Sequence, residues 1–201
     1  MAQNINLRNN EQQNYLYFHK DGLIDIAIGL GVLIFGLGIL VDLAWLAAIL
    51  PINIVILWKP IKKAFTAPRL SPDDQELLDN AAIRKTLALI SGLLWFLLGS
   101  GLALFLAISV GNVSTVAKDL IRAYFEPGFG VFLALVMGTV GLILSVQRFY
   151  LYSLLTLLIF LGGYFLQSGL PIALVLTGSM IILAGLVISW QFASSHPIRT
   201  E

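Results

Sequence analysis

Residues 19–41 have the sequence HKDGLIDIAIGLGVLIFGLGILV, and this stretch decides the class of fold. A polar heptapeptide, which ends at Asp25, is followed by sixteen residues that are all apolar or glycine. A helix of about 20 such residues is long enough to cross the hydrocarbon layer of a bilayer, which is roughly 30 Å thick. We therefore expect the first membrane span at 22–41, with one carboxylate a single turn inside it.

Glycines recur along this run at heptad spacing, at Gly22, Gly29 and Gly36 and again at Gly31 and Gly38. Asp25 lies three residues after the first glycine and four before the second, so the acid and the first glycine set share one helix face. A charge is costly in hydrocarbon, and a glycine face lets another helix approach closely. We expect this face to point into protein and to serve helix packing.

The composition agrees with a membrane protein. The chain is 58% hydrophobic and 11% charged, with a mean hydropathy of +0.90, whereas soluble domains are about 25% charged. A net charge of +1 argues against a nucleic-acid partner. The absence of cysteine excludes disulfides, thiolate metal sites and cysteine nucleophiles. We expect one membrane domain, with no metal, no cofactor and no soluble catalytic domain.

Six apolar runs predict an all-α, polytopic fold with transmembrane helices at 22–41, 43–58, 86–110, 128–146, 151–167 and 171–190. The second run has only sixteen residues, with Pro51 and Asn53 near its middle. It is either a thin, kinked span or a re-entrant piece, and we favour the span. Similar segments at 141–147 and 185–191 favour an arrangement in three hairpins.

The remaining segments are polar or amphipathic. The chain begins with a polar tail at 1–21 and ends with another at 191–201, and a long loop occupies 59–85. Residues 113–125 have apolar side chains at helical spacing and charged ones opposite, which is typical of an amphipathic helix. We expect that helix to lie in the membrane interface or across the top of the bundle.

Six spans place both termini on one side of the membrane. That side would carry ten of the twelve Lys and Arg residues, and the other side only Lys118 and Arg122. Positive charge accumulates on the cytoplasmic side of membrane proteins. We therefore expect both termini to be cytoplasmic and the chain to reside in a plasma membrane.

The densest ionisable cluster comprises His19, Lys20, Asp21 and Asp25. A histidine with two carboxylates can bind a metal or relay protons. Alternatively, Lys20 and Asp21 lie at the headgroups, and Asp25 is bonded to backbone or to a basic group of another span. We favour this second, structural interpretation, and keep His19, Asp21 and Asp25 as the candidate polar site.

Two further sets of residues serve packing and lipid binding. A small-residue stripe in the fourth span predicts helix packing through Gly130, Ala134 and Gly138. A basic stretch of the long loop predicts contact with anionic lipid headgroups through Lys59, Lys62, Lys63 and Arg69.

Two motifs in the first seventy residues resemble a family of uncharacterised bacterial multi-pass membrane proteins. They are the basic loop ending Thr66-Ala67-Pro68-Arg69 and the opening Tyr15-x-Tyr17-Phe18-His19-x-Asp21-Gly22-Leu23-Ile24-Asp25. That family has no assigned activity. The resemblance implies a bacterial inner membrane.

The sequence thus favours a non-enzymatic membrane interaction or assembly protein. It would pack through its glycine-rich faces against a second copy or another membrane protein. The alternative is a small-solute or proton-coupled transporter that uses Asp25, with Asp42 and Glu126 at the other mouth. An enzyme acting on lipid ranks third, because no paired acid–base constellation is visible.

Overall fold

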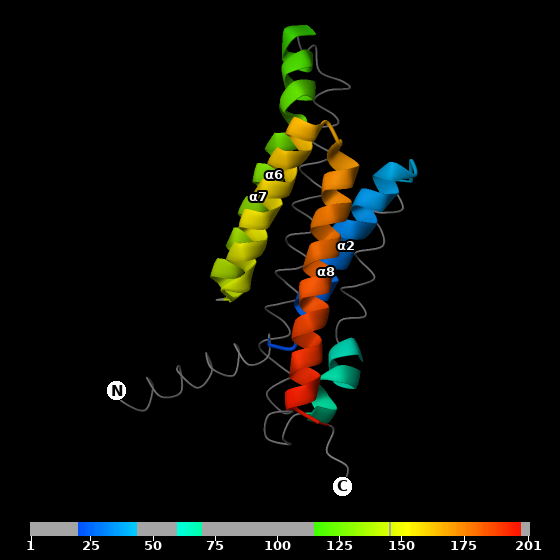
Figure 1. Ribbon diagram of the computed structural model, residues 1–201, viewed down its shortest axis with the longest axis vertical. Helices are drawn as coiled ribbons and strands as arrows, with labels where there is room; N and C mark the ends of the chain where they lie inside the picture. Colours follow the sequence, from blue (N-terminus) through cyan, green and yellow to red (C-terminus); the bar gives the residue numbers. More distant parts are fainter. Residues whose placement is uncertain (1–19, 44–59, 70–114, 145, 198–201) are drawn as a thin grey trace, which may run out of the picture.

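A computed structural model describes residues 20–43, 60–69, 115–144 and 146–197 of the chain (Figure 1). The regular structure in these ranges is helical throughout. It comprises α2 (Leu23–Leu40), a short helical segment at 60–65 that leads into η1 (Ala67–Arg69), α6 (Thr115–Leu144), α7 (Arg148–Leu166) and α8 (Leu170–Ser195).

Four of these helices are long and apolar enough to cross a membrane, namely α2, α7, α8 and the Tyr124–Leu142 part of α6. The predicted all-α membrane class is confirmed at this level. The predicted second and third spans lie, apart from Leu43, outside the described residues, and so do the first nineteen residues.

The ends of α2 are set by residues in the left-handed region of backbone conformation. Gly22, with φ 70°, directly precedes the helix, and Asp42, with φ 57°, follows it. Glycine and aspartate adopt this conformation more readily than most residues. Beyond the last turn, the Leu43 N–H donates to the Gly38 carbonyl at 2.7 Å, which satisfies one of the helix's terminal acceptors.

The structure corrects the expected break before the fourth span. An amphipathic helix at 113–125 and a separate span at 128–146 were predicted, whereas α6 is one helix of 30 residues with Pro127 inside it. Proline removes one backbone hydrogen bond and bends a helix, but it does not always end one. At about 1.5 Å per residue, α6 is longer than the hydrocarbon layer is thick. Its first turns extend beyond the other described helices (Figure 1).

α2 and α8 form an antiparallel pair that is packed backbone to backbone. A methyl group at Gly29 would lie 2.8 Å from the Ile182 nitrogen, and one at Gly36 would lie 2.8 Å from the Leu174 Cβ. The approach is mutual, because a methyl group at Gly178 of α8 would lie 2.5 Å from the Leu33 nitrogen. Glycine on both helices therefore permits this contact.

α6 and α7 form a second antiparallel pair. Gly130 of α6 faces the Phe160 side chain of α7, and Gly141 faces Phe149. Between these two contacts, the Ser153 hydroxyl donates to the Ala134 carbonyl at 2.7 Å. Bulky aromatic rings of α7 thus fill positions left open by the small residues of α6.

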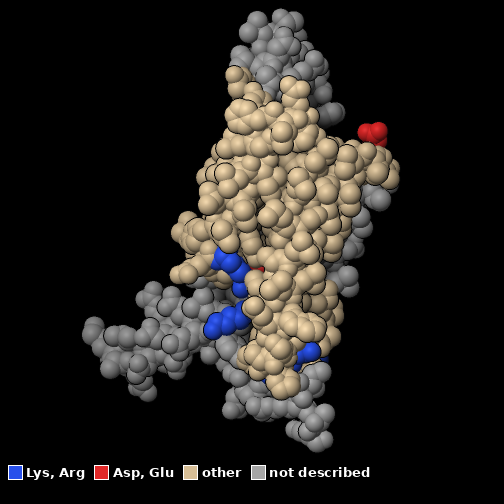
Figure 2. Space-filling view, viewed as in Figure 1, with Lys and Arg blue, Asp and Glu red and all other residues tan. Residues whose placement is uncertain are grey.

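α7 of one pair and α8 of the other meet at one end and diverge towards the opposite end (Figure 1). The short turn at 167–169 leads from α7 into α8, and the two helices diverge from it (Figure 1). We call the diverging end the basic end, because Lys20, Lys62, Lys63, Arg69 and Arg148 gather there (Figure 2). The opposite end, which holds Asp42 and the 167–169 turn, is called the far end.

Candidate functional site

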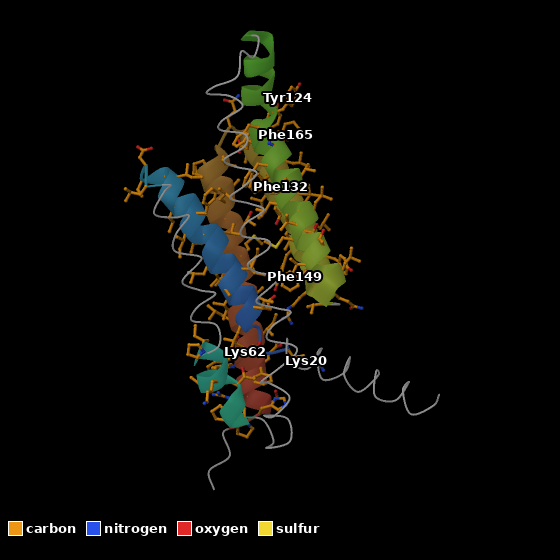
Figure 3. The ribbon with its side chains drawn as sticks, turned by 180° about the vertical axis from the view of Figure 1, so that it is seen from behind. Lys20, Lys62, Tyr124, Phe132, Phe149 and Phe165 are labelled. Carbon is orange, nitrogen blue, oxygen red and sulfur yellow. The ribbon has the colours of Figure 1, made fainter. Side chains whose placement is uncertain are left out.

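The site is a network of buried charges at the basic end, and Asp21 is its first member. One carboxylate oxygen, Oδ2, accepts from Lys62 Nζ at 2.5 Å and from Thr66 Oγ1 at 2.7 Å. The side chains of Asp21 and Lys62 are only 1% and 2% exposed. Figure 3 shows Lys62 close to the start of α2. The pair therefore attaches the 60–69 segment to the first span.

Asp21 also holds the start of α2 and the end of α8. Its Oδ1 accepts from the Leu23 N–H at 3.2 Å, which satisfies one of the free donors of the first helical turn. Its backbone carbonyl accepts from the Ser189 hydroxyl at 2.6 Å. Three segments that are distant in the sequence thus meet at one residue.

Asp25 lies one turn further along α2 and is paired with Arg148, the first residue of α7. Arg148 Nε donates to Oδ1 at 2.8 Å, and Nη2 lies 2.6 Å from Oδ2. The Asp25 side chain is fully buried, whereas that of Arg148 is 21% exposed. Nε thus makes a hydrogen bond and Nη2 a close ion contact, and this two-pronged contact fixes geometry as well as charge. The pair therefore links the α2–α8 pair to the α6–α7 pair.

Tyr152 lies one turn after Arg148 on the buried face of α7, and its hydroxyl interacts with the Asp25 carboxylate. Within the described residues, neither the Tyr152 hydroxyl nor Asp25 Oδ2 has a well-directed hydrogen bond. The ring of Tyr152 packs edge-on against Phe149, with centroids 5.5 Å apart. The buried carboxylate of Asp25 thus lies beside one cation and one phenol.

The two ion pairs act on each other. Burial lowers the pKa of the Lys62 amino group, and the Asp21 carboxylate beside it partly offsets that effect. Arg148 and Asp25 also act on Lys62 electrostatically. Two cations and two carboxylates therefore form one network with no net charge. Charges removed from water are tolerated in this way when each has a partner.

The structure brings together two of the three predicted site residues, Asp21 and Asp25, whereas His19 lies outside the described part. Among the predicted packing residues, Gly22, Gly29 and Gly36 lie against α8. Gly38, Gly130 and Ala134 are buried, Gly31 is half-buried, and Gly138 lies beside Ser153.

The predicted lipid-binding residues occupy different environments. Lys59 lies outside the described residues, and Lys63 is exposed. Lys62 is instead buried against Asp21, so its amino group is engaged inside the protein. The Arg69 guanidinium lies 4.5 Å from the centroid of the Phe65 ring and donates to the Phe65 carbonyl.

Sequence reasoning missed the partners that complete the site, namely Arg148, Tyr152, Thr66 and Ser189. Arg148 lies between two predicted spans, at 128–146 and 151–167, and is predicted only to be one of the ten basic residues on the cytoplasmic side. One signal was available, because a carboxylate inside an apolar helix requires a basic partner. Arg148 begins a span on the same side of the predicted membrane.

Within the described ranges, no three His, Asp or Glu side chains are grouped so that they could hold a metal ion. No family model, no curated protein and no solved structure matches this chain. The four long apolar helices identify a membrane protein, and the charge network is its most distinctive described site.

Proposed function

We propose that this chain is a non-enzymatic interaction or assembly protein of a bacterial inner membrane. The observation that supports it is the internal pairing of Asp21 with Lys62 and of Asp25 with Arg148. In each pair a carboxylate at the start of α2 is neutralised by a basic group from elsewhere in the chain. Pairs of this kind hold distant segments of the chain together.

The energetics favour a structural role for the pairs. Removing one partner of a buried ion pair costs about 3–5 kcal/mol, because the other charge remains buried and unpaired. A carboxylate that took up and released protons in a transport cycle would meet this cost whenever it was neutralised. The two-pronged contact between Asp25 and Arg148 therefore fits a permanent link between helices better than a transport step.

In the proposed arrangement, six spans in three hairpins place both termini and the basic end in the cytoplasm. Positive charge is retained on that side. The exposed side chains of Lys20 and Lys63 would contact anionic headgroups, at about 1 kcal/mol for each basic residue near the surface.

The packing partner would not use the glycine face of α2. α8 of the same chain already covers Gly29 and Gly36. A second copy, or another membrane protein, would therefore dock on the outer surface of the helix pairs. That surface is apolar and exposed in the described part, for example at Leu158 of α7 and Leu183 of α8.

Cysteine crosslinking in membranes tests the proposal, because the chain has no cysteine of its own. Single cysteines at Leu158 and Leu183 are expected to give a defined crosslinked species at one of the two faces, while a cysteine at the buried Thr177 gives none. A chain that stays monomeric at both positions, and crosslinks to no other membrane protein, contradicts an assembly role.

The second candidate is a proton-coupled transporter. Five buried side-chain polar atoms of the described residues have no well-directed hydrogen bond. Three of them favour this candidate, namely Asp25 Oδ2, the Tyr152 hydroxyl and, towards the far end, Glu126 Oε1. It predicts a pH-driven flux in proteoliposomes that is lost in Asp25→Asn. Such a flux would overturn the assembly proposal, and its absence would count against the transporter.

A further inference from the structure

The described helices form two pairs, each held along its length by close contacts. Gly29 and Gly36 seat α2 against α8, and Gly130 and Gly141 seat α6 against α7. In the α2–α8 pair the backbones touch, and in the α6–α7 pair glycines lie against aromatic rings. Sliding one helix along the other would therefore break many contacts at once. Each pair is therefore expected to move as a unit.

The junction between the pairs is of a different kind. α7 and α8 meet at the far end, where a methyl group at Gly163 would lie 3.7 Å from the Ala173 Cβ. They are connected there by the short turn at 167–169, in which Gln167 and Gly169 both have positive φ. Hinges consist of a few residues at element ends that absorb a change in backbone angle. The 167–169 turn has this position.

At the basic end, where α7 and α8 have diverged (Figure 1), the pairs share one buried apolar core, which includes Ile24 of α2 and Phe149 of α7, and they are also joined by a polar contact. Arg148, on the first turn of α7, reaches Asp25, on the first turn of α2, with two nitrogens. The carboxylate is fully buried, whereas the arginine side chain is partly exposed. An apolar contact tolerates small shifts because it has no preferred direction. A two-pronged ion pair requires a specific geometry, so a shift of either helix breaks it.

We propose that the Asp25–Arg148 pair is a latch, which holds the α6–α7 pair against the α2–α8 pair at the basic end. When the pair is broken, α7 moves away from α8 at that end and pivots about the 167–169 turn. The far end keeps its spacing. The chain therefore has an open and a closed arrangement, and the charge state of one ion pair selects between them.

Distance measurements between spin labels test the latch, because introduced cysteines would be the only ones in the chain. One label pair at Tyr150 and Trp190 reports the basic end of α7 and α8, and a second at Phe165 and Ile172 reports the far end. All four side chains are exposed. In Arg148→Gln, the basic-end distance is expected to lengthen and broaden by several ångströms, while the far-end distance is unchanged.

The double variant Asp25→Asn/Arg148→Gln separates the latch from simple damage to the fold. It leaves no unpaired buried charge, so it is expected to fold even if Arg148→Gln does not. Its basic-end distance should match that of the single variant, because both lack the same contact. Arg148→Lys keeps the positive charge but loses the two-pronged contact of the guanidinium. Its basic-end label distance should therefore lie between those of the wild type and of Arg148→Gln.

The neighbouring ion pair supplies the matched control. Asp21→Asn/Lys62→Met removes a buried pair from the same network, but one that joins α2 to the 60–69 segment and not to α7. Its label distances should equal those of the wild type. The latch is refuted by an unchanged basic-end distance in the double variant at Asp25 and Arg148. Equal changes at both ends, or the same opening in the control, also refute it.

Discussion

Gly29 of α2 and Gly178 of α8 touch through their backbones. A methyl group at Gly29 would lie 2.9 Å from the Gly178 carbonyl oxygen, and one at Gly178 would lie 2.8 Å from the Gly29 carbonyl oxygen. Neither atom is the movable end of a side chain, so the helices themselves would have to separate to admit one. The heptad glycines of the first span are thus used within the chain.

Gly29→Ala is therefore expected to destabilise the protein, by about 1–3 kcal/mol, because the added methyl group forces two backbones apart. The measurement is reversible unfolding in mixed micelles. Gly162→Ala is the matched control, since a methyl group there meets nothing within 4 Å. Removing glycine from an open helical position should be neutral or should stabilise by about 0.5–1 kcal/mol. Equal effects of the two substitutions would contradict the close contact.

The Asp25–Arg148 pair predicts a non-additive mutant cycle. Asp25→Asn and Arg148→Gln should each lower the free energy of unfolding, and Arg148→Gln by about 3–5 kcal/mol because it leaves a buried charge unpaired. The double variant should be more stable than Arg148→Gln alone. Unfolding curves of the three variants in micelles give the coupling energy. Strict additivity would show that the two side chains do not interact.

Thr66 should contribute through its hydrogen bond to Asp21. A hydrogen bond to a charged group contributes about 1.5–3 kcal/mol, so Thr66→Val is expected to destabilise by an amount in that range. Thr139→Val is the control, because the exposed Thr139 hydroxyl bonds only the Leu135 carbonyl of its own helix. That substitution should change stability by less than about 0.5 kcal/mol. Thermal unfolding of both variants makes the comparison.

Lys62 predicts a dependence of stability on alkaline pH. Burial lowers the pKa of its amino group below the ordinary value of 10.5. Between the folded and the unfolded pKa, the unfolded chain binds more protons, so the free energy of unfolding rises with pH in that window. The rise in the free energy of unfolding stops once the pH exceeds 10.5, the ordinary pKa of a lysine, because the amino group is then deprotonated in both states. Unfolding measured from neutral pH upwards should show this rise in the wild type. It should be absent from Asp21→Asn/Lys62→Met, and a rise of equal size there would assign the effect to other groups.

Much of the described fold could be predicted from the apolar runs. The first span was placed at 22–41 and is observed as Leu23–Leu40. The sixth was placed at 171–190, whereas α8 continues to Ser195, because a helix does not stop where its side chains become polar. The fifth was expected from residue 151, but α7 begins at Arg148. The charge of Arg148 does not prevent the helix from beginning there, because Arg148 forms an ion pair with Asp25.

The fourth span and the site show where prediction from sequence failed. The predicted break between 113–125 and 128–146 is wrong, because Pro127 lies inside the continuous helix α6, where its missing donor is tolerated. Asp21 and Asp25 could be identified because a charged residue at the edge of an apolar run is costly to bury and needs a partner. Their partners could not, since Lys62 is 41 positions away from Asp21 and Arg148 is 123 positions away from Asp25. No local periodicity encodes contacts over such separations.

The hydrogen bond between Ser189 and the Asp21 carbonyl has a consequence for how the protein is made. The two residues are 168 positions apart, and α8 also covers the glycine face of α2. At a synthesis rate of about 5–20 residues per second, α8 is made roughly 7–30 seconds after α2. During that interval α2 lacks the helix that covers its glycine face in the folded chain. α2 can therefore reach its final packing only after α8 has been synthesised.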